Sequence, residues 1–165
     1  MECAEAERQP EFGSRFSFHR LIYPSLLEFS VMIDTVLVPT KTVVNAKGDS
    51  PAIDISAAGH GIFLATLDIT DIIEQESLEI GIFGSPDGTA WDPKPIATFP
   101  QKFYRGQTPF LVDLSSHPNV KFIRAHWDVA RWGRGSETPM FEFGLSLKEV
   151  PREVMREVAT EARAL

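Results

Sequence analysis

The sequence predicts an all-β protein: an antiparallel, jelly-roll-like β-sandwich with a C-terminal helix. Three observations carry this prediction. About nine short segments alternate apolar and polar residues at a period of two, with turn residues between them. No helical pattern separates these segments, so a parallel sheet with crossover helices is excluded. A turn with strong local chemistry lies at the centre of the chain.

The central turn covers residues 85–91, which read Ser-Pro-Asp-Gly-Thr-Ala-Trp. The proline presets a negative φ for the first bend after Ser85. Asp87 can accept hydrogen bonds from nearby backbone N–H groups, and Gly88 can take the positive φ that closes the turn. Apolar runs at 78–84 and 94–99 flank the turn. We therefore expect a hairpin, with Trp91 closing one end of the core.

The strands before this hairpin are short and closely spaced. The expected strands are 33–38, ended by Pro39, then 41–45, 52–56 and 63–69. Residues 46–51 are rich in turn formers and are expected to form a loop. The polar stretch 70–77 is expected to form a single helical turn.

Three further strands are expected after the hairpin, at 108–114, 120–129 and 141–147. In each of them apolar side chains alternate with polar or small ones, which is typical of a half-buried strand. The residues expected to face the core are Leu67, Ile80, Ile82, Trp91, Val112, Ile123, Trp127, Phe141, Phe143 and Leu145.

The chain divides into a sandwich domain, 32–148, and two extensions. Residues 1–31 lack a clean period and are interpreted as an arm that packs on a neighbouring subunit, a poorly ordered tail, or an over-long start. Residues 149–165 predict an amphipathic helix that begins near Pro151. Its apolar stripe, a candidate oligomer interface, consists of Val150, Val154, Val158, Ala162 and Leu165.

Composition narrows the possible partners. The formal net charge of −7 argues against a nucleic-acid backbone or an anionic membrane surface. Cys3 is the single cysteine, so no internal disulfide can form. The first residues are acidic and no long apolar stretch follows them, so we expect no signal peptide and a cytoplasmic location, or a particle assembled in the cytoplasm.

No pattern in the sequence predicts catalysis, a metal site or a cofactor. The four histidines, His19, His60, His117 and His126, share no metal-ligand spacing. Asp87 and Asp92 flank Trp91 and could hold a calcium ion, but the central turn explains Asp87 equally well. We therefore expect a protein that is not an enzyme.

Two groups of polar residues are candidates for ligand binding. Arg131, Trp132 and Arg134 lie on a glycine-rich loop, where the tryptophan could stack on a sugar or contact an acidic partner. The alternative is that Trp132 folds back over the core. His126 lies between two charged residues on the polar face of its strand, which indicates either a binding group or, more simply, a solvated face.

Two short motifs resemble those of known families. Ser85, Asp87, Gly88 and Trp91 form an S-x-D-G-x-x-W hairpin, and Ile123, Arg124 and Trp127 lie on a later strand. Together with Thr35–Pro39 at the first strand, they resemble small all-β structural proteins of phages and prophages. The hairpin also resembles discoidin-type, galactose-binding-like modules, although the cysteines that often brace those modules are missing.

The first resemblance implies a non-catalytic virion or tail-type subunit that assembles into homo-oligomers. The second implies a carbohydrate-binding module that would use Arg131, Trp132, Arg134 and His126. The expected partners are therefore other copies of the chain or other assembly proteins, with carbohydrate as the alternative.

Overall fold

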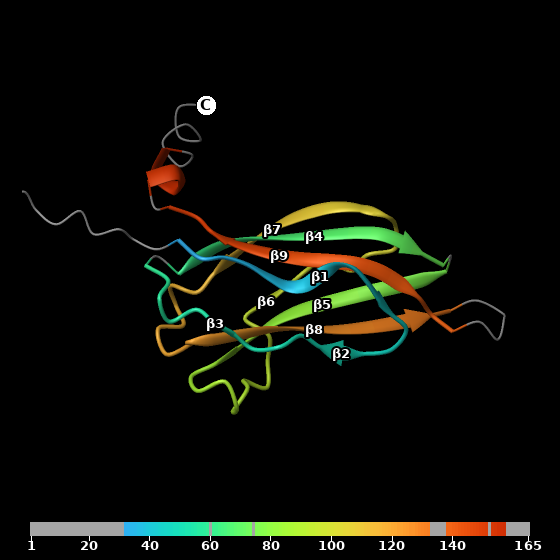
Figure 1. Ribbon diagram of the computed structural model, residues 1–165, viewed down its shortest axis with the longest axis horizontal. Helices are drawn as coiled ribbons and strands as arrows, with labels where there is room; N and C mark the ends of the chain where they lie inside the picture. Colours follow the sequence, from blue (N-terminus) through green and yellow to red (C-terminus); the bar gives the residue numbers. More distant parts are fainter. Residues whose placement is uncertain (1–31, 60, 74, 133–137, 152, 158–165) are drawn as a thin grey trace, which may run out of the picture.

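The computed structural model describes residues 32–59, 61–73, 75–132, 138–151 and 153–157. Two antiparallel sheets pack face to face and run the length of the molecule (Figure 1). The strands are β1 (Asp34–Val44), β2 (Gly48–Asp49), β3 (Ile53–Asp54), β4 (Ile62–Ile72), β5 (Glu76–Ser85), β6 (Ala97–Thr98), β7 (Gly106–Asp113), β8 (Phe122–Arg131) and β9 (Phe141–Glu149).

The order of the strands is that of a jelly roll. One sheet has the order β1-β9-β4-β7 and the other β2-β8-β5-β6, with β3 also paired to β8. Strands that follow one another along the chain therefore often lie in different sheets, as in the paired Greek keys of this fold. The predicted all-β sandwich is confirmed.

Side chains that alternate at a period of two fill the space between the sheets. Phe63, Phe141 and Phe143 are fully buried, as are the matching positions of β5 and β8. The core residues predicted from the sequence that are buried are Leu67, Ile80, Ile82, Val112, Ile123, Phe141, Phe143 and Leu145. Trp127 is half-buried against this core, with its ring edge-on to Phe143 at 5.8 Å.

Trp91 does not close the core, and that prediction is wrong. Its ring is partly exposed and lies under the guanidinium group of Arg124, which is 4.4 Å from the ring centroid. Arg124 is on the polar face of β8, since its neighbours Ile123 and Ala125 are the buried residues. The turn therefore returns the tryptophan to the outer face of the five-stranded sheet.

The first two predicted strands are one strand, β1. Pro39 does not end it, because the register shifts on both sides of Val38 absorb an irregular segment in which Lys41 has a φ of 62°. An edge strand tolerates proline in such a bulge. The bulge lies against Gly144, where an added Cβ would be 2.8 Å from the Cα of Thr40.

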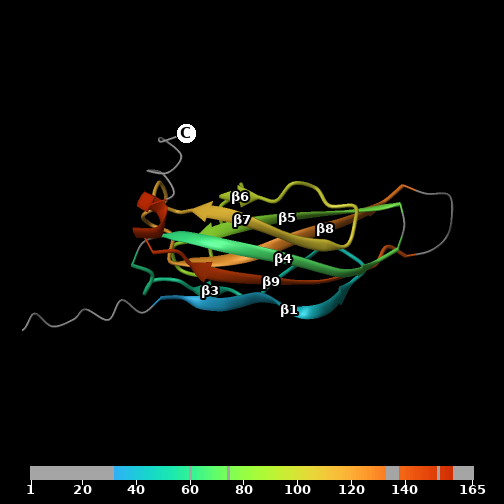
Figure 2. The ribbon, with the colours of Figure 1, turned by 90° about the horizontal axis from the view of Figure 1, so that it is seen from above.

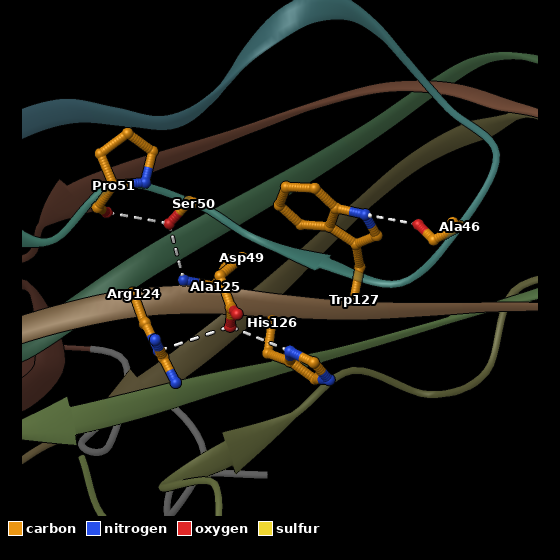
Figure 3. Close-up of polar contacts among 8 residues, drawn as sticks. All are labelled: Ala46, Asp49, Ser50, Pro51, Arg124, Ala125, His126 and Trp127. Carbon is orange, nitrogen blue, oxygen red and sulfur yellow. Dashed lines mark hydrogen bonds and ion pairs between the residues drawn. The ribbon is translucent and has the colours of Figure 1, made fainter.

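Residues 46–51 are not only a turn, because β2 lies within them. Between β2 and β3, Ser50 continues the pairing with β8: its N–H donates to the carbonyl of Ala125 at 2.8 Å, and its hydroxyl accepts the Ala125 N–H at 2.9 Å. Pro51 then interrupts the ladder, because proline has no N–H to donate. Figure 3 shows this interruption beside β8.

Residues 70–77 do not form the predicted helical turn. β4 continues to Ile72 and β5 begins at Glu76, so a tight connection replaces the helix. The polar side chains of this stretch suit the outer face of a strand, and the Thr70 hydroxyl donates to Glu142 Oε1 at 2.7 Å. Gln75 closes the connection with a φ of 65°.

The central hairpin is confirmed, since β5 pairs with β6 through Gly81–Thr98 and Ile82–Ala97. Asp87 Oδ1 accepts the N–H groups of Thr89 and Ala90 at 2.9 and 2.8 Å. Gly88 has a φ of 77°. The hairpin is nevertheless less regular than expected, because β6 has 2 residues.

The C-terminal helix is present over residues 153–157, at the end where β9 finishes (Figures 1 and 2). Val150 is half-buried and Val154 is exposed. The remaining stripe positions Val158, Ala162 and Leu165, and the extension 1–31, lie outside the described residues. In the described part of the chain, no helix is long and apolar enough to cross a membrane.

Candidate functional site

A hollow of about 630 Å³ lies at the end of the sandwich where β4 is joined to β5, and we call it the aromatic hollow. Ile72 of β4 lines it together with three aromatic and three polar side chains: Phe103, Tyr104, Trp132, Gln75, Glu76 and Arg105. They come from three connections, β4–β5, β6–β7 and β8–β9, together with the first residue of β5. Both sheets therefore contribute to this site.

The segment 103–105 is held at both of its ends. Before it, the Lys102 N–H donates to the Leu78 carbonyl at 2.9 Å, and the Leu78 N–H donates back to the Lys102 carbonyl at 2.8 Å. After it, Gly106 pairs with Ile69 in β4 and has a φ of 138°, which favours glycine. The chain crosses here from one sheet to the other and leaves the side chains of 103–105 at the surface.

Trp132 directly follows the last residue of β8. Its backbone N–H donates to the carbonyl of Gln75 at 3.2 Å, which joins the β8–β9 connection to the β4–β5 connection. The ring of Phe103 lies beside it, with the two ring centroids 5.6 Å apart and the ring planes at 73°. The backbone of Trp132 is thus fixed by pairing, while its side chain is 58% exposed.

The three rings lie edge-to-face, with Phe103 next to both of the others. Phe103 contacts Tyr104 as well as Trp132, at a centroid distance of 6.5 Å and a plane angle of 63°. Phe103 is 38% exposed and Tyr104 is 80% exposed. Neighbouring exposed aromatic rings of this kind mark binding surfaces more often than stray surface residues do.

Glu76 forms the base of the aromatic hollow and is 1% exposed. Its two carboxylate oxygens accept the N–H of Met140 at 3.1 and 3.0 Å. A buried carboxylate needs such partners, because removing it from water is costly. The contact fixes the start of β5 to the segment that leads into β9.

Arg105 and Asp71 form an ion pair at the rim, with Arg105 Nη2 2.6 Å from Asp71 Oδ1. Both side chains are exposed, so the pair adds little to stability. It does balance the guanidinium charge, and the planar group still offers its other N–H donors to a ligand. Gln75 adds an amide with both donor and acceptor atoms.

The sequence-predicted loop residues are only partly brought together here. Trp132 lines the aromatic hollow, and Arg131, the last residue of β8, pairs across the sheet with Glu76. Arg134 lies outside the described residues. His126 lies further back on β8, where Figure 3 shows it with residues of β2.

His126 belongs to a polar cluster on the outer face of the five-stranded sheet. Asp49 Oδ1 lies 2.9 Å from His126 Nδ1 and 3.5 Å from Arg124 Nε (Figure 3). An ionised carboxylate can only accept, so this contact favours the histidine tautomer with its proton on Nδ1. The charges of β8 thus pair across the sheet with β2, as on a solvated strand face.

The hairpin residues Ser85, Asp87 and Gly88 stabilise a turn. Hydrogen bonds from the N–H groups of Ala90 and Thr89, with a contribution from the Ser85 hydroxyl, hold the pKa of Asp87 well below its ordinary value. The Gly88 N–H donates to the Ser85 hydroxyl at 2.9 Å. Among the described residues, no group of three or more His, Cys, Asp or Glu side chains could hold a metal ion.

Sequence reasoning did not find Phe103, Tyr104, Arg105, Gln75 or Glu76. A usable signal existed for the first three, since adjacent aromatic residues precede Gly106 in a stretch that continues no alternating pattern. Aromatic side chains between two predicted strands are candidates for a binding site, just as Trp132 is. Glu76 carried no comparable signal, because a single acidic residue beside a strand is ordinarily exposed.

Comparison with known proteins does not place the chain in a family. No protein-family model matches it, and a search of curated proteins finds no significant match. The resemblance to phage structural proteins, and the weaker one to discoidin-type modules, stay predictions.

Proposed function

We propose that this protein is a non-catalytic jelly-roll module that binds carbohydrate in the aromatic hollow. The observation that carries the proposal is the set of three exposed rings, Phe103, Tyr104 and Trp132, beside the planar polar groups of Gln75 and Arg105. The three rings form the apolar part of the site. Gln75 and Arg105 supply hydrogen-bond donors and an acceptor at its border.

A sugar ring matches both properties. A pyranose has apolar C–H faces that can stack on an aromatic ring, and hydroxyls around its edge that take paired hydrogen bonds from amide and guanidinium groups. The ion pair between Arg105 and Asp71 balances the charge at the rim. A neutral ligand therefore fits the site without leaving an unpaired charge in the interface.

The glycan-binding test uses an array of immobilised glycans probed with the native chain and two variants. We expect binding by the native protein, loss of at least about tenfold in affinity for Trp132→Ala, and partial retention for Trp132→Phe, which keeps a smaller ring. Thermal unfolding checks that each variant is folded. A native chain that binds no glycan, or a Trp132→Ala variant that binds as well as native, contradicts the proposal.

The second candidate is the phage-like assembly subunit, and the outer face of the four-stranded sheet favours it. Val36, Leu64 and Leu111 are exposed on this face, and Leu64 and Leu111 are direct cross-strand neighbours. Both edge strands of the sheet carry proline, Pro39 in β1 and Pro109 in β7, which discourages pairing of edges between copies. Copies would therefore meet through the face of the sheet rather than through its edges.

Light scattering tests self-association. We expect an oligomer that dissociates when Leu64→Lys places a charge on the outer face. Removing the helix asks whether the C-terminal stripe contributes, and the cut must follow Val150, because Glu149 and Val150 donate backbone hydrogen bonds to Ile33 and Ile62 at 2.7 and 2.8 Å. A native chain that is monomeric at all concentrations contradicts the assembly function and leaves carbohydrate binding unaffected.

A further inference from the structure

A second hollow, of about 260 Å³, adjoins the aromatic hollow. The two share Phe103, Tyr104 and Arg105, so the segment 103–105 forms a ridge between them. Tyr104 is the most exposed of the three rings, at 80%. A ligand longer than one ring can therefore lie in one hollow and continue across Tyr104 into the other.

Several polar side chains line the second hollow. Gln101, Lys102 and Gln107 line it together with the shared segment. The Gln101 amide donates from Nε2 to Glu79 Oε1 at 2.7 Å, which holds the amide in one orientation and leaves its carbonyl oxygen as an acceptor. Lys102 and Gln107 add donors. These groups suit the hydroxyls of a sugar better than an apolar chain.

We propose that the site binds an oligosaccharide of at least two linked sugar units rather than a single sugar. One unit stacks in the aromatic hollow beside Trp132, and the next unit crosses Tyr104 and hydrogen-bonds with Gln107 and Gln101. This proposal rests on the carbohydrate-binding function proposed above. The further proposal specifies the length of the ligand and the residues that bind its second unit.

Linkage is the physical reason for a preference in length. Once the first unit is bound, the second is held near its own hollow at a high effective concentration, so its contacts add affinity without a second full loss of translational freedom. A monosaccharide can occupy the aromatic hollow but gains nothing from the second hollow. The affinity should therefore rise from one unit to two.

Isothermal titration tests this with the monosaccharide, disaccharide and tetrasaccharide of the sugar that binds best on the array. For the native chain we expect the disaccharide to bind about two- to tenfold more tightly than the monosaccharide. Gln107→Ala and Tyr104→Ala should remove most of this gain, whereas Tyr104→Phe, which keeps the ring, should preserve it. Gln107→Ala should leave the affinity for the monosaccharide unchanged.

The possible failures are distinguishable. Equal affinities for the monosaccharide and the disaccharide, with binding still lost in Trp132→Ala, would overturn the two-unit site and leave the proposed function standing. A gain with length that survives both Gln107→Ala and Tyr104→Ala would also overturn it, because the second unit would then lie elsewhere. An absence of binding to every glycan on the array would overturn the proposed function itself.

Discussion

The connections between strands are stabilised in different ways at the two ends of the sandwich. At one end, the connections β3–β4, β5–β6 and β7–β8 each have an aspartate, at the end of the preceding strand or just after it, that accepts a backbone N–H from a residue two or three positions further on. We call it the aspartate end. At the other, aromatic end, the connections β4–β5, β6–β7 and β8–β9 contact one another and leave aromatic rings exposed.

Local hydrogen bonds close the loops of the aspartate end. Asp54 accepts the Ser56 N–H at 2.8 Å, Asp113 accepts the Ser115 N–H at 2.8 Å, and Asp87 accepts two N–H groups. The pKa of Asp54 is lowered by the hydroxyl and N–H of Ser56, and that of Asp113 in the same way by Ser115. Each turn thus has short-range hydrogen bonds of its own. The N–H groups of Leu114 and Lys121 add bonds between segments, to the carbonyls of Gly61 and Ser85 at 2.7 and 2.9 Å.

Contacts between distant segments hold the aromatic end. The Glu76 carboxylate binds Met140, and the Trp132 N–H binds Gln75. The comparison teaches that the aspartate end combines short-range turns with contacts between segments around a hollow of about 410 Å³, whereas at the aromatic end contacts between segments fix the backbone and leave aromatic rings at the surface. A rigid backbone under exposed rings is what a preformed binding site needs.

The largest effect on stability is expected from Glu76→Ala at the aromatic end. The substitution removes a buried carboxylate and leaves the part-buried N–H of Met140 without this acceptor, so the free energy of unfolding should fall by about 1–3 kcal/mol. Urea denaturation measures this change. Glu76→Gln, which retains an acceptor oxygen, should lose less, and an alanine variant as stable as the native chain would show that the contact does not hold the two segments together.

The second-largest effect is expected at the aspartate end, where lowering the pH should reduce the free energy of unfolding. The folded-state pKa of Asp54, Asp87 and Asp113 is lowered below the ordinary 3.8, so their stabilisation is complete well above that value and is lost as the pH falls below it. Asp87→Asn keeps an acceptor for the turn but cannot titrate. Urea midpoints from about pH 7 to about pH 3 should therefore bring native and variant closer together at the acid end. A gap that stays constant over this range would contradict the assignment.

The smallest effect on stability is expected from Tyr104→Ala. Because this ring is 80% exposed, the free energy of unfolding should change by no more than about 0.5 kcal/mol, even where glycan binding is weakened. Thermal unfolding and titration on the same samples separate the two properties. A loss of more than about 1 kcal/mol would mean that the ring stabilises the fold, and the contrast between the two ends would then be weaker.

Much of the fold could be predicted from the sequence. Alternation at a period of two identified the buried faces of β4, β8 and β9, because burying one face of a strand constrains every second residue. The chemistry of Asp87 and Gly88 identified the central turn. The errors at Pro39 and Trp91 share a cause, since a bulge and the return path of a loop depend on the neighbouring strand and sheet rather than on local propensity.

The candidate site was visible only in part. Trp132 stood out as a tryptophan between arginines, but its contact with Phe103 depends on two connections that are distant in sequence meeting at one end of the sandwich. For His126 the sequence favoured a solvated strand face over a binding group, and β2 supplies its partner, Asp49, on the outer face of the sheet. No local pattern distinguishes these two outcomes.

The sequence by itself determined the strand faces, the central turn at Asp87 and the class of fold, because each depends on interactions within a few residues or on a simple periodicity. The tertiary structure decided which connections gather at which end, that Glu76 is buried beneath them, and that the segment 103–105 separates two hollows. These features arise from the strand order β1-β9-β4-β7 and β2-β8-β5-β6, which brings distant residues together. The site follows from that order, since its side chains come from segments whose meeting no local interaction encodes.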